Sequence, residues 1–120
     1  MSSSRSDIER RVARDAERRA GEDVELRDRM AEEIVGLFPG CPGERARSIA
    51  RHTSLRGPGR VGRSAAGRAL DAAALELAVA AAVRHEATRY DELLMTGMER
   101  ELARARVRDE VARILDGWRR

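Results

Sequence analysis

Apolar residues recur at helical spacing in the first part of the chain, but they form only a thin stripe. Ile8, Val12 and Ala16 follow one another at intervals of four, and most residues around them are Arg, Asp or Glu. A stripe this narrow is typical of a helix that is solvated or loosely docked. We expect residues 1–21 to form a charged helix or arm, and residues 6–20 to be the segment through which a homodimer would form.

The limits of the first helices are marked by residues with known end preferences. Ser6, with Glu9 three positions later, has the pattern of a capping box and predicts a helix start. Gly21 interrupts the apolar pattern, and a second helix is expected over residues 22–37, because Pro39 pushes the residue before it out of the helical region. The apolar face of this helix is predicted to comprise Val24, Ala31, Ile34, Val35 and Phe38.

A third, short helix follows a connector that is rich in proline and glycine. Pro42 is suited to the first position of this helix, since a proline there loses no hydrogen bond. Cys41, just before it, is expected to be a small, half-buried residue. The inner face of the helix should consist of Ala46, Ile49, Ala50 and Thr53.

A long loop and an apolar helix come next. Residues 55–68 contain the turn sequence Gly-Pro-Gly and predict a loop whose length is typical of a functional or disordered segment. Asp71 then begins a helix, and from residue 72 to 83 only Glu76 is charged. A helix that is apolar on nearly every side is predicted to be buried. We therefore place this Ala-rich helix at the centre of the fold.

The last part of the chain predicts two more helices. Thr88 and Asp91 have the spacing of a helix cap, and Gly97 is suited to end that helix. A long helix over residues 98–118 follows, with a sustained apolar stripe. No segment has the alternation of a strand. The sequence thus predicts a small, compact, all-α bundle of about five helices, with residues 22–120 as a single domain. The stripe comprises Leu102, Ala103, Val107, Val111, Ile114, Leu115 and Trp118.

The charges are distributed unevenly. The 24 basic residues of the chain are all arginines, against 21 acids. Residues 44–68 hold seven arginines and one acid, a net charge of +6, whereas the segments on either side are slightly negative. A GC-rich coding bias accounts for arginine in place of lysine, but it does not account for the missing acids. The excess of positive charge predicts an anionic partner.

The middle of the chain is also suited chemically to phosphate groups. Guanidinium groups bind phosphate oxygens in pairs, and the glycines between them leave backbone N–H groups accessible. Aromatic residues make up only 2% of the chain, which argues against base stacking and favours contact with the backbone of a DNA duplex or structured RNA. The predicted contacts are Arg47, Arg51, Arg56, Arg60, Arg63 and Arg68, with His52 and Arg84 at the edge.

Two other functions are consistent with the sequence. A small enzyme acting on a phosphorylated substrate would use His52 or His85 as its base, but we favour a local hydrogen bond from His85 to Thr88 or Asp91. A scaffold domain would instead present the same arginines to an acidic protein. No catalytic motif, cofactor fingerprint or metal-ligand spacing is recognisable, so none of these is predicted.

Several features predict a soluble, cytoplasmic protein. Cys41 is the only cysteine, which excludes an internal disulfide. The first residues contain no apolar run of the kind that a secretion signal needs. The uncharged apolar run of residues 77–83 is much shorter than the roughly 18 residues of a membrane span.

Several short segments from Phe38 onward form a recognisable pattern. They are F-P-G-C-P at 38–42, I-A-R-H-T at 49–53, R-G-P-G-R-V-G-R-S at 56–64, R-H-E-A-T-R-Y-D-E-L-L at 84–94, A-R-A-R-V at 103–107 and Trp118. In these segments the chain resembles an uncharacterised bacterial and fungal family called domain of unknown function 2293. The resemblance covers about two thirds of the chain, and the part before about residue 22 carries no matching pattern. It supports the predicted fold, but it assigns no catalytic or binding residue.

Overall fold

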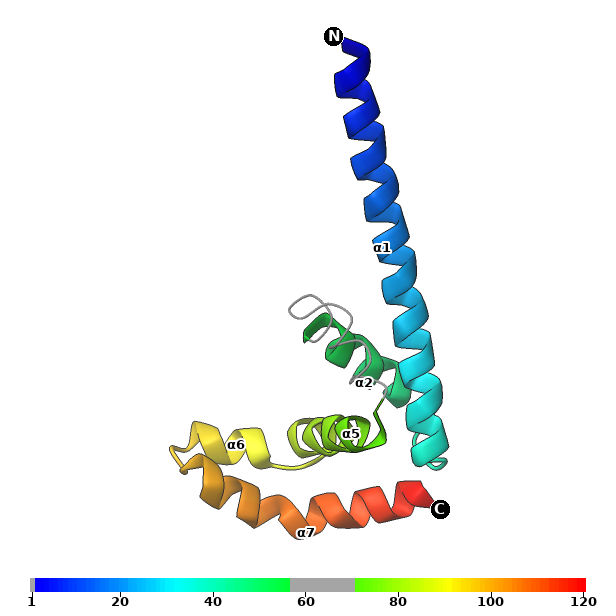
Figure 1. Ribbon diagram of the computed structural model, residues 1–120. Coiled ribbons are helices and arrows are strands. Elements are labelled where there is room, and N and C mark those ends of the chain that lie inside the picture. The colour runs from blue at the N-terminus through cyan, green and yellow to red at the C-terminus, as the bar shows by residue number, and fades with distance from the viewer. Residues whose placement is uncertain (1, 57–70) are drawn as a thin grey trace.

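The computed structural model describes residues 2–56 and 71–120, and their side chains over residues 5–54 and 71–120. These ranges contain five helices and no strand, which confirms the predicted all-α fold. Helices α2 and α5 pack against the C-terminal part of α1, α6 and α7 pack against α5 and each other, and the rest of α1 projects away from them (Figure 1). The helices are α1 (Ser2–Leu37), α2 (Gly43–Arg56), α5 (Ala72–Ala87), α6 (Tyr90–Met95) and α7 (Arg100–Arg119).

Helix α1 is continuous, so the predicted start at Ser6 and the predicted break at Gly21 are both wrong. A glycine in a helix interior costs only about 1 kcal/mol. Charge pairs bridge this position, because Arg18 lies 3.2 Å from Asp15 and 4.0 Å from Glu22. No competing cap or turn is available to end the helix there. The division of the chain between residues 21 and 22 into an arm and a domain stays a prediction.

The buried face of α1 is a stripe with a spacing of four, and the sequence pattern identified only half of it. Leu26 and Met30, which the prediction omitted, are buried together with Ile34 and Phe38. The predicted Val24 and Val35 are instead 44% and 39% exposed, because they lie outside this stripe.

The connector after α1 is fixed by the C-terminal end of the chain. The backbone N–H of Gly40 donates to the carbonyl oxygen of Trp118 at 2.6 Å. A Cβ atom on Gly40 would lie 3.0 Å from the carbonyl oxygen of Gly117 and from Cα of Trp118, so only glycine fits here without displacement. Arg119 places its guanidinium carbon 5.2 Å from the centroid of the Phe38 ring. These contacts close the fold, with the end of α7 against the end of α1.

Helix α2 begins one residue later than predicted and ends beyond the expected position. The carbonyl oxygen of Pro42 accepts a hydrogen bond from the N–H of Ala46 at 2.9 Å, so Pro42 precedes the helix instead of opening it. The predicted inner face is confirmed. Ala46, Ile49 and Ala50 are buried, and Thr53 is half-buried.

Helix α5 is buried on one side only, so the prediction of burial on every side is wrong. Leu75, Val79 and Val83 form its buried stripe. Leu77 is 73% exposed, and the alanines next to the stripe are half-buried or exposed. In the described ranges only α1, α2, α6 and α7 can cover α5, and these four helices leave one of its sides exposed. The helix is nevertheless central, because it contacts each of them (Figure 1).

A short helix and a tight turn connect α5 to α7. Gly97 ends α6 with a φ of +93°, the left-handed conformation that glycine adopts without strain. Its N–H bonds to the carbonyl oxygen of Leu94 at 3.0 Å, and the N–H of Met98 bonds to that of Leu93 at 3.1 Å. This pair is the Schellman arrangement, as expected for a helix that stops at glycine.

Helix α7 buries a narrower stripe than predicted. Leu102 is 61% exposed, whereas the remaining predicted positions are buried or half-buried. Within the described residues no helix is both long and apolar enough to cross a membrane. The buried stripe consists of Ala103, Val107, Val111 and Leu115, and Ile114 and Trp118 pack at its edge.

Candidate binding groove and arginine flank

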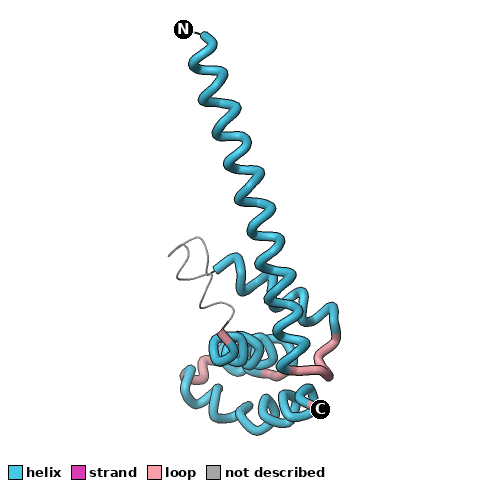
Figure 2. Tube along the Cα trace, turned by 45° about the vertical axis from the view of Figure 1, so that its right-hand side comes forward, coloured by secondary structure: helices cyan, strands magenta, loops and turns pink. Residues whose placement is uncertain are grey.

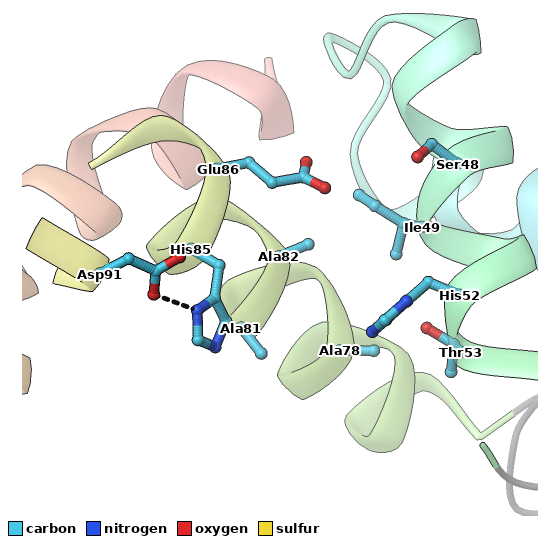
Figure 3. A pocket seen from close by; sticks show the side chains of 10 residues that line it. All are labelled: Ser48, Ile49, His52, Thr53, Ala78, Ala81, Ala82, His85, Glu86 and Asp91. Atoms are coloured by element: carbon cyan, nitrogen blue, oxygen red, sulfur yellow. Dashed lines mark hydrogen bonds and ion pairs between the residues drawn. The ribbon is translucent and has the colours of Figure 1, made fainter. Parts of the chain in front are cut away.

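Helix α2 presents different chemistry on its two flanks. Arg47 and Arg51, four residues apart, are exposed on one flank. His52, one position after Arg51, reaches from α2 toward α5 (Figure 3). Successive residues of a helix are separated by 100° around its axis. The predicted phosphate contacts of α2 are therefore divided between an outer arginine flank and an inner flank that faces α5.

The outer flank is not uniformly positive. Arg47 lines a shallow hollow of about 460 Å³ between α1 and α2, and Asp28 and Glu32 of α1 line the same hollow. Neither Arg47 nor Arg51 forms an ion pair with any residue in 5–54 or 71–120. The nearby carboxylates of α1 weaken the positive potential at Arg47. Arg51 is the better-placed cation for an external anion.

The inner flank is joined to α5 by an ion pair. Arg45 donates to the Glu86 carboxylate, and the two side chains are 38% and 44% exposed. Solvent-exposed ion pairs are worth about 0.2–1 kcal/mol, so this partly exposed pair links α2 to α5 but contributes little to the stability of the fold. It also pairs both charges, so Arg45 and Glu86 are already engaged with each other.

A groove of about 490 Å³ runs between α2 and α5 and brings together the only two histidines of the chain (Figure 3). Its floor is formed by three alanines of α5. The α2 wall carries His52 with two hydroxyl groups, and the far end carries His85, Glu86 and Asp91. The lining residues are Ser48, Ile49, His52, Thr53, Ala78, Ala81, Ala82, His85, Glu86 and Asp91.

His85 is held by Asp91, as the local interpretation of this histidine predicted. The Nδ1 atom of His85 lies 2.6 Å from Oδ1 of Asp91. Its ring also meets that of Tyr90 edge-on, with centroids 5.2 Å apart and an interplanar angle of 78°. A carboxylate can only accept, so Nδ1 carries the hydrogen and Nε2 of the neutral ring is an acceptor. The second ring nitrogen points away from Asp91 (Figure 3).

The corner between α5 and α6 fixes the position of this pair. The Thr88 hydroxyl donates to the carbonyl oxygen of Arg84 at 2.5 Å and accepts from the N–H of Tyr90 at 3.2 Å. The Arg84 guanidinium carbon lies 5.8 Å from the centroid of the Tyr90 ring. Arg84 is half-buried, and its contact with the Tyr90 ring competes with its predicted role at the edge of an anion site. Asp91, predicted as the capping-box partner of Thr88, bonds to His85 instead.

The other predicted phosphate contacts lie outside the side chains that the structure describes. Arg56 is the last residue of α2, and its side chain is outside the described set. Arg60, Arg63 and Arg68 lie outside the described residues altogether. The predicted site is therefore described only at Arg47, Arg51, His52 and Arg84, and of these only His52 lines the groove.

Sequence reasoning did not find the groove. It placed His52 on one flank of a helix and His85 at the end of another, and nothing in their separation of 33 positions predicts that they meet. Ser48 carried no signal except its spacing of four from His52. The alanine run of α5 was taken as core, although part of it forms the open floor.

Cys41 is more deeply buried than expected, with 5% of its surface exposed. Burial raises the pKa of its thiol above the ordinary value of 9.0, and the positive charge of Arg45 lowers it in partial compensation. Its Sγ lies 3.5 Å from the carbonyl oxygen of Pro42. A buried thiol with a raised pKa is a poor nucleophile. Cys41 therefore contributes to packing.

Comparison with protein families gives one match, to a family described as "Uncharacterized conserved protein (DUF2293)", over residues 33–119. The chain belongs to this family. The match begins in the last turns of α1 and includes every other helix, so it covers the packed part of the molecule. No curated protein and no solved structure shows a significant match to this chain. The resemblance first noted in the sequence is thereby confirmed, and the family description supplies no activity.

Proposed function

We propose that this protein binds the phosphate backbone of nucleic acid through the outer flank of α2 and the Gly/Arg-rich segment that follows it. The observation that carries the proposal is the charge of +6 over residues 44–68, which contain a single acid, Glu44. Charge concentrated in this way attracts polyanions at long range and neutralises phosphates on contact. In the described part of this segment, Arg51 is exposed and has no carboxylate partner in 5–54 or 71–120.

The arrangement of α2 supports backbone contact more than base reading. Arg47 and Arg51 lie one helical turn apart, about 6 Å, which matches the separation of successive phosphates in order of magnitude. Neither shares its flank with an aromatic side chain. Because Arg47 stands next to Asp28 and Glu32, we expect Arg51 to contribute more to binding than Arg47.

The test is a salt titration of binding to duplex DNA, structured RNA and heparin. Each phosphate contact that is lost should reduce the slope of log affinity against log salt by about 0.9 on duplex DNA. We expect the Arg47→Ala, Arg51→Ala double variant to lose between one and two such units, and the Arg56→Ala, Arg60→Ala, Arg63→Ala triple variant to lose more. Helicity by circular dichroism should be unchanged.

The matched control is Arg104→Ala with Arg108→Ala on α7. These arginines are exposed and also four residues apart, so the variant loses the same charge from a different face. An equal loss of slope in this control would show a general charge effect instead of a site. An absence of binding to all three ligands at low salt would overturn the proposal and favour an acidic protein partner or a small phosphorylated substrate.

Two further expectations belong to the same proposal. The single cysteine favours action in a reducing compartment such as the cytoplasm. The exposed Ile8 and Val12 in residues 6–20 favour self-association through the projecting part of α1. Sedimentation of the full chain beside the Ile8→Ser, Val12→Ser variant tests the second expectation, and a monomer at high concentration would contradict it.

A further inference from the structure

The groove between α2 and α5 has the size and lining of a small-molecule site. Its volume of about 490 Å³ falls in the range of roughly 300–1,000 Å³ that is usual for ligand pockets. Ala78, Ala81 and Ala82 form a floor of methyl groups between two polar walls (Figure 3). A flat apolar floor with polar edges suits a planar heterocycle, whose faces are apolar and whose edge carries hydrogen-bonding groups.

The charges of the groove exclude some occupants. Both carboxylates that line it are engaged, Glu86 with Arg45 and Asp91 with His85. Among the described residues no group of three His, Cys, Asp or Glu side chains could hold a metal ion. The groups available to a ligand are therefore the two imidazoles and the hydroxyls of Ser48 and Thr53. These are hydrogen-bonding groups, and they favour a polar edge over a cation.

His85 gives the groove a directional preference. Because Asp91 fixes the hydrogen of the ring on Nδ1, Nε2 of the neutral ring can only accept a hydrogen bond. Exocyclic amino groups of adenine, cytosine and guanine donate such bonds and project beyond the ring edge. Uracil and thymine offer only the ring N3–H, which lies between two carbonyl oxygens that would face the acceptor. A base with an amino group therefore reaches Nε2 of His85 more readily than uracil does.

The groove and the arginine flank lie on neighbouring sides of α2, because His52 of the groove directly follows Arg51. Arg51 and His52 are adjacent in sequence, so a phosphate at Arg51 and a base directed along His52 are separated by about 100° around α2. A strand that crosses the outer flank of α2 can turn one base into the groove without leaving its phosphate contact.

We propose that the groove receives a single unstacked nucleobase that carries an exocyclic amino group, held between His52 and His85 over the alanine floor. This inference rests on the proposed function, because the phosphate contacts bring the strand to α2. It adds a base-reading element to a surface that otherwise contacts only the backbone. Unstacked bases are bound in this way mainly from single strands, loops and bulges.

The experiment uses the two histidines as reporters. With only two histidines in the chain, a two-dimensional carbon–proton NMR spectrum contains two imidazole Cε1–H signals, which can be assigned with His52→Gln and His85→Gln variants. The probes are short single-stranded oligonucleotides of adenine, cytosine or uracil at one salt concentration. We expect both histidine signals to move with the adenine and cytosine strands, and to move less with the uracil strand. The single Trp118, outside the groove, serves as the internal reference.

A filled groove provides the matched variant. Ala81→Leu places a larger side chain on the floor without removing a polar group, and Ala73→Leu makes the same change at an exposed position of α5 outside the groove. We expect Ala81→Leu to bind the adenine strand about tenfold more weakly and to abolish the preference over uracil, because stacking or edge contacts to one base are worth about this much. Ala73→Leu should behave as the wild type.

The outcomes separate this inference from the proposed function. If the strands bind with a steep salt slope but neither histidine signal moves in the wild type, the groove is not a base site and backbone binding stands. If both signals move equally with all three bases, the amino-group preference is wrong. If no strand binds at any salt concentration, the proposed function fails together with this inference. The wild-type spectra decide the first two cases whether or not Ala81→Leu folds.

Discussion

The two ends of α1 belong to one continuous helix, but they are supported in different ways. From Leu26 onward the helix buries a side chain at every fourth position, down to Phe38. Before Leu26 every described side chain is exposed except that of Asp15, which is half-buried, and the helix projects into solvent (Figure 2). Ile8 and Val12 are 56% and 59% exposed. The packed end is stabilised by burial, and the projecting end has only local interactions.

Those local interactions are side-chain charge pairs one turn apart. Arg10 pairs with Asp7, and Arg18 lies within 4.0 Å of both Asp15 and Glu22. Each such pair stabilises a helix by about 0.2–0.5 kcal/mol. Burying a large apolar side chain contributes several times as much. The comparison shows that helical structure in α1 extends further than tertiary packing does, and that the stability of the two ends should respond to different substitutions.

The largest expected difference is between truncations of apolar side chains at the two ends. Phe38→Ala removes a fully buried aromatic ring and should lower the free energy of unfolding by about 3–5 kcal/mol. In the monomer, at low protein concentration, Val12→Ala removes exposed atoms and should change it by less than about 0.5 kcal/mol. Urea unfolding followed by circular dichroism measures both. A large effect of Val12→Ala would show that the projecting end packs against something in solution.

The next difference concerns two glycines. Gly40→Ala forces a Cβ atom against backbone atoms of Gly117 and Trp118 at 3.0 Å and should cost about 1–3 kcal/mol. Neither contact is with a flexible side chain, so the end of α7 must move. Thermal unfolding measures the loss, and the Trp118 fluorescence should report the displacement. An unchanged melting temperature would show that the contact between the two chain ends is loose.

Gly21 should respond in the opposite direction. A Cβ atom at this position meets nothing within 4 Å, and the residue lies in a helix interior. Gly21→Ala should therefore favour the helix by about 1 kcal/mol. The effect should appear as greater helicity and slower amide exchange in residues 5–25, with little change in the unfolding of the packed end. Equal stabilisation throughout would mean that the two ends unfold as one unit.

The smallest expected effect involves pH and the thiol of Cys41. The pKa of this thiol is raised in the folded protein by burial, so above pH 9.0 the unfolded chain loses a proton that the folded chain keeps. The free energy of unfolding should therefore fall as the pH rises through 9.0 toward the folded value, and below that range Cys41 should have no effect.

Cys41→Ala is the control, since the alkaline decline should be less steep without the thiol. At neutral pH the thiol should react slowly with a thiol reagent, and removal of residues 2–20 should leave that rate unchanged. A faster reaction in the shortened chain would contradict the independence of the two ends.

Much of the helical structure was determined by local sequence. Pro39 ends α1 at Leu37, Gly97 ends α6, and the buried positions of α2 follow from its apolar spacing. These features depend on residues within one turn of each other, so the pattern alone predicts them. The same local reasoning failed at Gly21, where a helix continues because nothing ends it, and at Leu77 and Leu102, where apolar residues remain exposed.

The sequence by itself determined the fold class, the ends of α1 and α6 at Pro39 and Gly97, the excess charge of residues 44–68, and a local bond from His85 to Thr88 or Asp91. Only the tertiary structure decided which side of α5 is buried, that Arg47 faces the acids of α1, and that His52 and His85 line one groove. The physical reason is that helix formation depends on neighbours three or four residues away. The groove depends on how α2 crosses α5, which is set by packing between residues far apart in the chain.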